Sequence, residues 1–264
     1  MDLGLRDRLA IVTGSTSGIG FATAQLFARE GARVILNGRK RARLDDALAR
    51  LRAEVPGASV DGVVADVSTA AGTDALIEQV PDADILVNNA GIFAPQPFET
   101  ILDEDWQRFF DANVMSGVRL SRHYLPRMLA KNSGRIIFVS SESALQIPVE
   151  MIHYGMTKTA QLAISRGLAE RTRGTAVTVN SVLPGPTASE GVTDFVAKLA
   201  ADGGMSTSEM ERQFFQHARP SSVLQRFATP LEIANMIVYV ASAAASATNG
   251  AALRVDGGVL RSIA

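Results

Sequence analysis

The chain has 264 residues, 47% of them hydrophobic, which is enough for one large α/β core. Its 26 basic and 27 acidic residues give a formal charge of −1, which excludes a general field that would attract nucleic acid or anionic lipid. The lack of cysteine excludes disulfides and thiolate metal sites. Charges interrupt MDLGLRDRLAIVTG where a signal peptide needs an apolar core, and no apolar run is long enough to span a membrane, so we expect a soluble cytoplasmic protein.

Seven short apolar runs predict strands. In chain order they are LAIVTG (9–14), RVILNG (33–38), VDGVVAD (60–66), DILVNNAG (84–91), RIIFVSS (135–141), VTVNSVLPG (177–185) and ALRVDGG (252–258). Their continuous apolar character is typical of strands buried on both faces, as in a parallel sheet. Helical patterns fill the intervals, and TPLE at 229–232 combines a Thr N-cap, a Pro at the first helical position and a Glu three residues after the cap. The alternation predicts one doubly wound α/β domain over residues 1–264.

One segment, 186–228, interrupts this alternation because it contains no strand pattern. It combines helical patches with apolar residues, namely Phe195, Leu199, Phe214, Phe215 and Val223. A long connection of this kind in a compact domain is typical of a functional lid. We therefore expect an insertion that covers the substrate site.

The first strand leads directly into TGSTSGIG at 13–20, with glycines at 14, 18 and 20. Glycines at a strand-to-helix turn let the backbone bend and approach a pyrophosphate, which then lies at a helix N-terminus. The spacing differs from the common G-x-G-x-x-G pattern, and taken alone the motif could also be a tight turn without a ligand.

The second strand ends in VILNGRKRAR (34–43), which indicates the type of dinucleotide. Enzymes that prefer NAD usually place an acid here to hold the ribose 2′-hydroxyl, but Gly38 occupies that place and Arg39 follows. A guanidinium can bind a 2′-phosphate through paired hydrogen bonds. The alternative, a solvated basic start to a helix, is disfavoured because cations at a helix N-terminus oppose its dipole. We therefore expect NADP(H) rather than NAD(H).

Together with later motifs, these residues resemble the short-chain dehydrogenase/reductase (SDR) family over nearly the whole chain. The matching motifs are T-G-x-x-x-G-I-G at 13–20, N-N-A-G at 88–91, Ser141, Tyr154 with Lys158, and P-G at 184–185. The resemblance implies a Rossmann-type sheet of about seven parallel strands, a nicotinamide cofactor and a homotetramer or homodimer. Many similar proteins are 3-oxoacyl carrier-protein reductases.

The expected cofactor contacts follow the strand ends. Asp66 can accept a hydrogen bond from an adenine amine, or alternatively cap the next helix. The family pattern P-G-x-x-x-T places a hydroxyl against the carboxamide; here Ser189 holds that position and Thr187 lies nearer the Pro-Gly pair, so both stay open. The complete expected set is Gly14, Ser15, Ser17, Gly18, Ile19, Gly20, Arg39, Asp66, Val67, Asn89, Ala90, Gly91, Tyr154, Lys158, Pro184, Gly185 and Thr187.

Tyr154 and Lys158 are four residues apart on a helix expected after Pro148, so their side chains share one face. A nearby ammonium group favours the phenolate, and an oxidised nicotinamide ring would add further positive charge. Tyr154 could then exchange a proton with an alcohol or carbonyl near neutral pH. Gly155, beside the tyrosine, would leave room for the cofactor.

Ser141 ends the fifth strand, where its hydroxyl can polarise the substrate oxygen. Ser140 and Ser143 compete for this role, and the family spacing selects Ser141. The resemblance also implies that Asn113 is catalytic, because its backbone carbonyl would hold a water that relays protons to the lysine. Alternatively, Asn113 is a solvent-facing helical residue.

The remaining polar residues predict little chemistry. The three histidines have no metal-site spacing, so no metal is expected, and His153 is interpreted as a surface residue. The basic run Arg119, Arg122, Arg127 and Lys131 reads as a solvated helix face, with docking of an acidic carrier protein as a weaker alternative.

The leading hypothesis is an NADP(H)-dependent oxidoreductase acting on a small carbonyl or alcohol, with a 3-oxoacyl thioester as first substrate choice. Three alternatives stay open: a non-catalytic NADP-binding sensor, an NAD-dependent polyol or steroid dehydrogenase, and a sugar-nucleotide epimerase or dehydratase. An epimerase or dehydratase is disfavoured because enzymes of that kind have a different glycine spacing and a larger C-terminal substrate domain.

Overall fold

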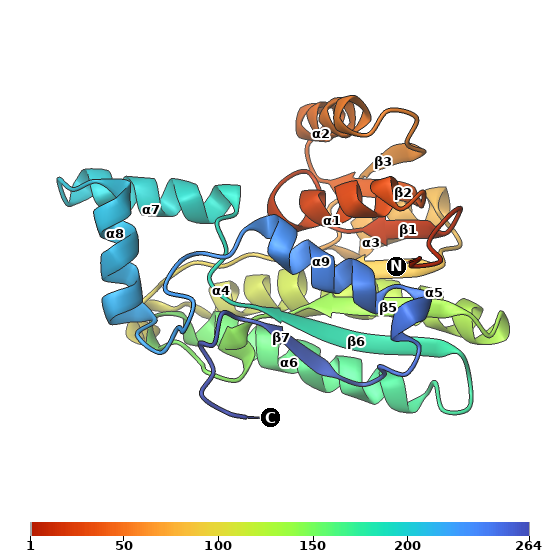
Figure 1. Ribbon diagram of the computed structural model, residues 1–264. Helices are drawn as coiled ribbons and strands as arrows, with labels where there is room; N and C mark the ends of the chain where they lie inside the picture. The colour runs from red at the N-terminus through yellow and green to blue at the C-terminus, as the bar shows by residue number, and fades with distance from the viewer. Residues whose placement is uncertain (1, 264) are drawn as a thin grey trace.

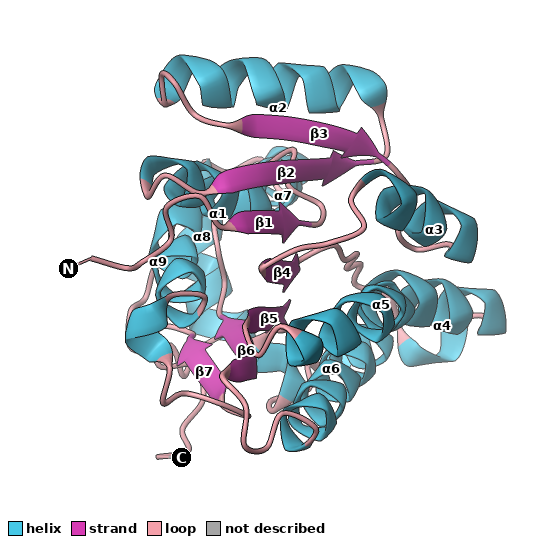
Figure 2. Ribbon diagram, turned by 90° about the vertical axis from the view of Figure 1, so that its right-hand side faces the viewer, coloured by secondary structure: helices cyan, strands magenta, loops and turns pink. Residues whose placement is uncertain are grey.

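The fold is a parallel sheet of seven strands covered by helices on both faces (Figures 1 and 2). The computed structural model describes residues 2–263, without the side chains of residues 195, 199 and 202. The strands are β1 (Leu9–Val12), β2 (Arg33–Gly38), β3 (Val60–Val64), β4 (Ile85–Asn88), β5 (Gly134–Val139), β6 (Val177–Pro184) and β7 (Ala252–Val255). Their order is β3-β2-β1-β4-β5-β6-β7. The seven predicted strands and the doubly wound α/β class are therefore confirmed.

The strands form where predicted, but all except β2 end earlier, because the last residues of those apolar runs build the turns at the carboxyl edge. Residues 13 and 14 leave β1 for the glycine-rich turn, and 140 and 141 leave β5. This edge holds the ligand crevice in open α/β sheets, at the point where the strand order reverses. Here the reversal lies between β1 and β4.

Alternation along each strand divides the core into two layers. Ala10 and Val12 of β1 pack with α1 (Gly18–Arg29), α2 (Arg41–Glu54) and α9 (Pro230–Val240) on one face. Ile11 packs on the other face, with α3 (Ala70–Gln79), α5 (Ser116–Ala130) and α6 (Ile152–Glu170). The helix α4 (Asp103–Phe110) precedes α5 on that face (Figure 2). The continuous apolar runs follow from burial on both sides.

Helix α9 begins as the sequence predicts. Thr229 accepts a hydrogen bond from the backbone N–H of Glu232, whose side chain returns to Thr229, and Pro230 opens the helix. Within residues 2–263, no helix is both long and apolar enough to cross a membrane.

The interrupting segment is helical. It contains α7 (Glu190–Asp202), α8 (Thr207–Gln213) and a π-helical turn, Phe214–Ala218, and Figure 1 shows α7 and α8 extending beyond the sheet on one side. At its base Thr187 and Ala228 form an isolated parallel bridge. Phe215 is buried and Val223 is 83% exposed, while the side chains of Phe195 and Leu199 lie outside the described groups.

Candidate active site

A cleft of about 280 Å³ lies at the carboxyl ends of β1, β2, β3 and β4. This is the place that the reversal in strand order predicts. The cleft is lined by Gly14, Thr16, Ser17, Asn37, Gly38, Arg39, Ala65, Asp66, Val67, Ser68, Asn89, Ala90, Gly91, Ile92 and Ala112. The lining includes eight of the expected cofactor contacts, from four turns: Gly14, Ser17, Arg39, Asp66, Val67, Asn89, Ala90 and Gly91.

The turn before α1 fits a phosphate group. Gly14 and Gly18 have φ values of +61° and +57°, a conformation that favours glycine. A Cβ at Gly20 would lie 2.5 Å from Nδ2 of Asn89. Ser17, the N-cap residue, makes no capping side-chain hydrogen bond, so the helix N-terminus keeps its free N–H groups for an anion.

Two expected contacts in this turn are directed into the protein. Ser15 is fully buried; its hydroxyl donates to the Val12 carbonyl at 2.7 Å and accepts from the Asn37 N–H at 2.9 Å. Ile19 packs against the apolar core on the α1 face. Thr16, which the sequence analysis did not name, lines the cleft between them.

Asn37 is a second residue that sequence reasoning missed. It is a polar side chain within the apolar run RVILNG, and it is buried. Its amide donates to the carbonyls of Val63 and Ala65 at 3.2 and 3.1 Å, and its oxygen accepts from the Gly14 N–H at 3.3 Å. Asn37 therefore joins the turns that follow β1 and β3.

The end of β2 has no room for an acidic side chain. A Cβ at Gly38 would lie 2.5 Å from Cγ2 of Thr16. Arg39 is exposed and lines the cleft, whereas the neighbouring Arg41 pairs with Asp45 at 2.9 Å within α2. The steric contact with Thr16 explains the glycine, and it leaves Arg39 as the charged group at this corner.

Asp66 lines the cleft and is not the N-cap of α3. One of its carboxylate oxygens accepts from the backbone N–H and the hydroxyl of Ser68, at 3.1 and 2.7 Å. Thr69 caps α3, accepting from the Gly72 N–H at 3.0 Å. The alternative interpretation of Asp66 as a helix cap is therefore wrong.

The NNAG turn joins the cofactor cleft to the expected catalytic residues. The Asn89 amide donates to the carbonyls of Thr13 and Gly14, at 2.9 and 3.1 Å. A Cβ at Gly91 would lie 3.1 Å from Oδ1 of Asn113 and 3.6 Å from Nζ of Lys158. The backbone at Gly91 therefore passes beside both side chains.

Tyr154 and Lys158 share one face of α6, but the phenol and the ammonium are not in direct contact. Lys158 Nζ donates to the Val139 carbonyl at 2.9 Å and lies 5.6 Å from the centroid of the Tyr154 ring. Burial lowers the pKa of Lys158 to about 8. Burial, followed by the negative charge of Glu142, raises the pKa of Tyr154. Within the protein alone, burial therefore opposes ionisation of the Tyr154 phenol, and the phenolate expected with the lysine and a bound oxidised nicotinamide stays a prediction.

Ser141 lies at the end of β5, near Tyr154. Its hydroxyl donates to Oε2 of Glu142 and accepts from the Ser143 N–H at 3.1 Å. Ser140 is used elsewhere, since its hydroxyl donates to the Lys158 carbonyl at 2.9 Å. The serine that the family spacing selects is thus the one beside the tyrosine.

Asn113 is fully buried in a π-helical turn, Asp111–Met115, between α4 and α5. Its oxygen accepts from the Ile92 N–H at 2.7 Å, and its amide donates to the Thr157 hydroxyl at 2.9 Å. The solvent-facing alternative is therefore wrong. Single π turns inside helices are frequent at functional sites.

The Asn113 carbonyl has a protein partner that the sequence analysis did not name. Nε2 of Gln161 donates to this oxygen at 2.5 Å, and Oε1 of Gln161 lies 3.4 Å from Nζ of Lys158. Gln161 is three residues after Lys158 and thus on the same helix face, which is a signal the sequence contained. It occupies the position between carbonyl and lysine where the family resemblance implied a water.

The Pro-Gly turn after β6 is tightly packed. A Cβ at Gly185 would lie 2.5 Å from the Asp256 carbonyl oxygen, and Thr187 is buried with its hydroxyl donating to the Gly185 carbonyl at 2.8 Å. Ser189 lies against the phosphate turn, because a Cβ added to Gly18 would lie 3.1 Å from the Cβ of Ser189. Both candidate hydroxyls therefore stay close to the cofactor turns.

Two expectations beside the catalytic residues are wrong. His153 is fully buried and packs on Phe109, with ring centroids 4.0 Å apart, because the helix turns it away from Tyr154 and into the α4 interface. A Cβ at Gly155 would meet Ile147 at 2.7 Å and the Ser143 carbonyl at 3.2 Å, so this glycine admits the neighbouring loop rather than the cofactor.

Most of the basic run on α5 is exposed as expected, namely Arg122, Arg127 and Lys131, and only Arg119 is half-buried. Arg119 is only 19% exposed; it donates to the Ser68 carbonyl at 2.9 Å and pairs with Asp111 at 3.2 Å. Lys131 pairs with Asp82 at 3.1 Å. Arg119 is thus engaged within the protein, and carrier-protein docking through the rest of this run stays a prediction.

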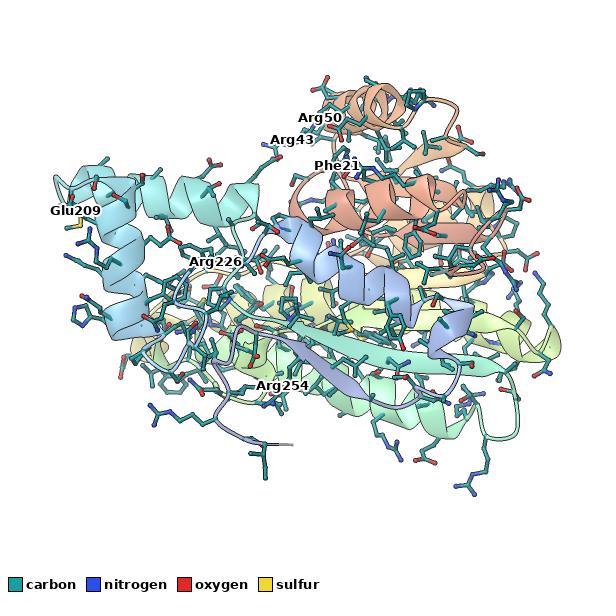
Figure 3. The ribbon with its side chains drawn as sticks, viewed as in Figure 1. Phe21, Arg43, Arg50, Glu209, Arg226 and Arg254 are labelled. Atoms are coloured by element: carbon teal, nitrogen blue, oxygen red, sulfur yellow. The ribbon has the colours of Figure 1, made fainter. Side chains whose placement is uncertain are left out.

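The insertion contacts both ends of the cleft. Figure 3 shows Arg50 of α2 beside Phe21 of α1; its guanidinium lies 4.3 Å from the Phe21 ring centroid and 3.8 Å from the Glu190 carboxylate at the start of α7. At the catalytic end, Arg219 is buried and pairs with Glu142 at 3.0 Å. The insertion is thus attached to the domain by charged side chains at two places.

Comparison with known proteins agrees with this geometry. Residues 8–200 match the family described as short chain dehydrogenase. The chain is 50% identical to the uncharacterized oxidoreductase YvrD of Bacillus subtilis over the full length of both, and 30% identical to the 3-oxoacyl acyl-carrier-protein reductase FabG of Aquifex aeolicus, covering 98% of this chain and 100% of that protein.

Among solved structures, the chain superposes on L-sorbose reductase from Gluconobacter frateurii complexed with NADPH and L-sorbose. The TM-score is 0.94 with 35% sequence identity, and the match covers 100% of both chains. Fold, site and sequence thus agree, and the protein is an oxidoreductase that belongs to the short-chain dehydrogenase/reductase family.

Proposed function

We propose that the protein is an NADP(H)-dependent reductase of small carbonyl compounds, with Ser141, Tyr154, Lys158 and Asn113 as its catalytic residues. The observation that carries this proposal is that Tyr154, Lys158 and Asn113 come together beside Gly91, at one end of the dinucleotide cleft. Ser141 reaches the same place from the end of β5.

A nicotinamide bound in the cleft supplies or accepts the hydride. Tyr154 donates a proton to the substrate oxygen, and because its pKa is raised it carries that proton at neutral pH. The Ser141 hydroxyl stabilises the oxygen as negative charge develops on it. Lys158, held by the Val139 carbonyl and Gln161, supplies positive charge near the tyrosine.

NADP(H) is favoured over NAD(H) by the corner at the end of β2. Arg39 lines the cleft there, and the contact of Gly38 with Thr16 leaves no room for the acid that would hold a 2′-hydroxyl. The similarity to L-sorbose reductase complexed with NADPH supports this choice.

The relatives support two kinds of carbonyl substrate. One is a 3-oxoacyl thioester, by similarity to FabG, and the other is a ketose, by similarity to L-sorbose reductase. A homotetramer or homodimer is part of the proposal; exposed Phe98 and Leu102, at 55% and 63%, support an apolar contact between subunits.

The test is NADPH oxidation by the purified protein with a panel of ketones, hydroxy ketones and 3-oxoacyl thioesters. Turnover that Tyr154→Phe abolishes, while NADPH still binds, supports the proposal. Tight NADPH binding without hydride exchange on any carbonyl would instead favour the sensor hypothesis. Light scattering of the same preparation gives the number of subunits.

A further inference from the structure

A buried carboxylate lies directly beside the reacting group, and no motif accounts for it. Glu142 follows Ser141 in the chain and is 5% exposed. Its Oε2 accepts from the Ser141 hydroxyl, from the Ser143 N–H at 2.8 Å and from the Ser143 hydroxyl at 3.1 Å. A negative charge so close to an oxygen that must itself become negative requires a specific function.

The charge of Glu142 is balanced by the insertion. Nε of Arg219 donates to Oε1 of Glu142 at 3.0 Å, and Nη1 of Arg219 donates to Glu150 at 3.1 Å. Glu150 is 43% exposed and lies in the turn Val149–Met151 before α6. Arg219 therefore binds Oε1 of Glu142, and Oε2 is directed to Ser141.

The hydrogen bonds of Ser141 conflict with its catalytic role. A serine hydroxyl has one hydrogen, and in this structure Ser141 gives it to Glu142 while its oxygen accepts from the Ser143 N–H. To polarise a substrate carbonyl, Ser141 must turn that hydrogen away from Glu142. Oε2 of Glu142 then loses a donor while it remains buried, which weakens binding unless the substrate replaces the donor.

We propose that Glu142 accepts a hydrogen bond from a hydroxyl on the carbon next to the reacting carbonyl, so that the preferred substrates are α-hydroxy ketones. The two oxygens of such a group lie on neighbouring carbons. They can therefore reach Ser141 and Glu142 together, because those two side chains are within one hydrogen bond of each other. In the reverse reaction the substrate is a vicinal diol.

This inference rests on the proposed function and selects between the substrates left open there. A 3-oxoacyl thioester has no hydroxyl beside its reacting carbonyl, and a simple ketone has none either, so with both of them Oε2 keeps only its two donors from Ser143. A site built to bind a substrate hydroxyl discriminates strongly against analogues that lack it. A role confined to fixing the insertion would predict no such discrimination.

The experiment compares matched substrates that differ by one hydroxyl. NADPH oxidation is measured with acetone and hydroxyacetone, with acetophenone and its α-hydroxy derivative, and with the acetoacetyl thioester of N-acetylcysteamine. We expect kcat/KM to be about 10- to 100-fold higher for each hydroxy ketone than for its partner, as one hydrogen bond to a charged group implies.

Two variants locate the effect. Glu142→Gln keeps the shape but replaces a charged acceptor by a weaker neutral one, so the preference for hydroxy ketones should fall about tenfold. Glu150→Gln is the matched control: it alters the other partner of Arg219, which does not contact Ser141, and it should leave the preference unchanged within about twofold.

Each result bears on one of the two proposals. No turnover of any carbonyl contradicts the proposed function. Turnover of carbonyls without a preference for hydroxy ketones, or a preference for the thioester, contradicts the role of Glu142 and leaves the reductase intact. Equal effects of Glu142→Gln and Glu150→Gln on both members of a pair would also overturn it. Because the absence of a wild-type preference contradicts the proposal by itself, a poorly folding variant does not prevent the test.

Discussion

The two ends of the cleft are built in different ways. At the dinucleotide end, backbone geometry makes the surface: glycines at positive φ, an uncapped helix N-terminus and missing Cβ atoms. At the catalytic end, buried side chains make the surface. They include the hydrogen-bonded ion pair between Glu142 and Arg219, which are 77 residues apart in sequence. Backbone surfaces suit a cofactor common to many enzymes, whereas side-chain networks can change with the substrate.

The largest effect that separates the two ends is expected from Tyr154→Phe. The variant loses the proton donor, so kcat should fall about 10²–10⁴-fold, while the Kd for NADPH stays close to wild type. Stopped-flow rates and fluorescence titration of NADPH measure the two quantities. Near-normal kcat would remove Tyr154 from the proton transfer.

A somewhat smaller loss is expected from Ser141→Ala. Removal of one donor to the developing oxyanion typically lowers kcat about 10²–10³-fold, and NADPH affinity should not change. Ser140→Ala is the control, since that hydroxyl bonds the Lys158 carbonyl inside the protein. If only cofactor affinity suffered in the Ser141 variant, the serine would belong to the dinucleotide end.

Arg39→Ala tests the dinucleotide end directly. Loss of a charge-assisted contact to the 2′-phosphate should weaken NADPH binding about 10- to 100-fold and leave NADH binding unchanged. Arg41→Ala, whose guanidinium pairs with Asp45, serves as the control and should alter neither affinity. Equal weakening of the two cofactors, or a wild-type preference for NADH, would contradict the NADP(H) assignment.

The smallest expected effect concerns stability rather than rate. Burial lowers the pKa of His153, with the charges of Asp105 and Arg108 as secondary influences. The unfolded chain then binds the extra proton more readily, so the free energy of unfolding should decrease as pH falls below about 6.5. Urea unfolding at several pH values measures this slope.

His153→Phe should reduce that slope, because the ring that packs on Phe109 no longer titrates. His217→Asn changes an exposed histidine and should leave the slope as in wild type. An unchanged slope in the His153 variant would assign the acid sensitivity to other groups.

Local patterns were enough to predict most of the fold. Three patterns depend only on residues close together in the chain, and each appears in the structure. They are the seven apolar runs, the TPLE cap and the glycine spacing. The positions of Arg39, Ser141 and Tyr154 followed from motifs whose spacing is tied to strand ends. These features depend on backbone geometry that short stretches of sequence determine.

The features that were missed depend on partners distant in sequence. The burial of His153 depends on Phe109 in another helix. The spacing of Gln161 from Lys158 was visible in the sequence, but its second partner, the Asn113 carbonyl, was not. The pKa of Tyr154 is raised by burial and by Glu142, and the spacing between Tyr154 and Lys158 reveals neither influence. Glu142 was not singled out in the sequence, because its partner Arg219 lies 77 residues further along the chain.

The bridge between Thr187 and Ala228 has a consequence for how such enzymes diverge. Two backbone hydrogen bonds join the first and last residues of the insertion there. The Ala188 N–H donates to the Ala228 carbonyl at 2.8 Å, and the Ala228 N–H donates to the Pro186 carbonyl at 2.9 Å. Residues between these points can lengthen, shorten or be exchanged without shifting the register of β6 or the start of α9. The bridge is thus a natural boundary for recombination, through which a new recognition element can be grafted onto an unchanged redox scaffold.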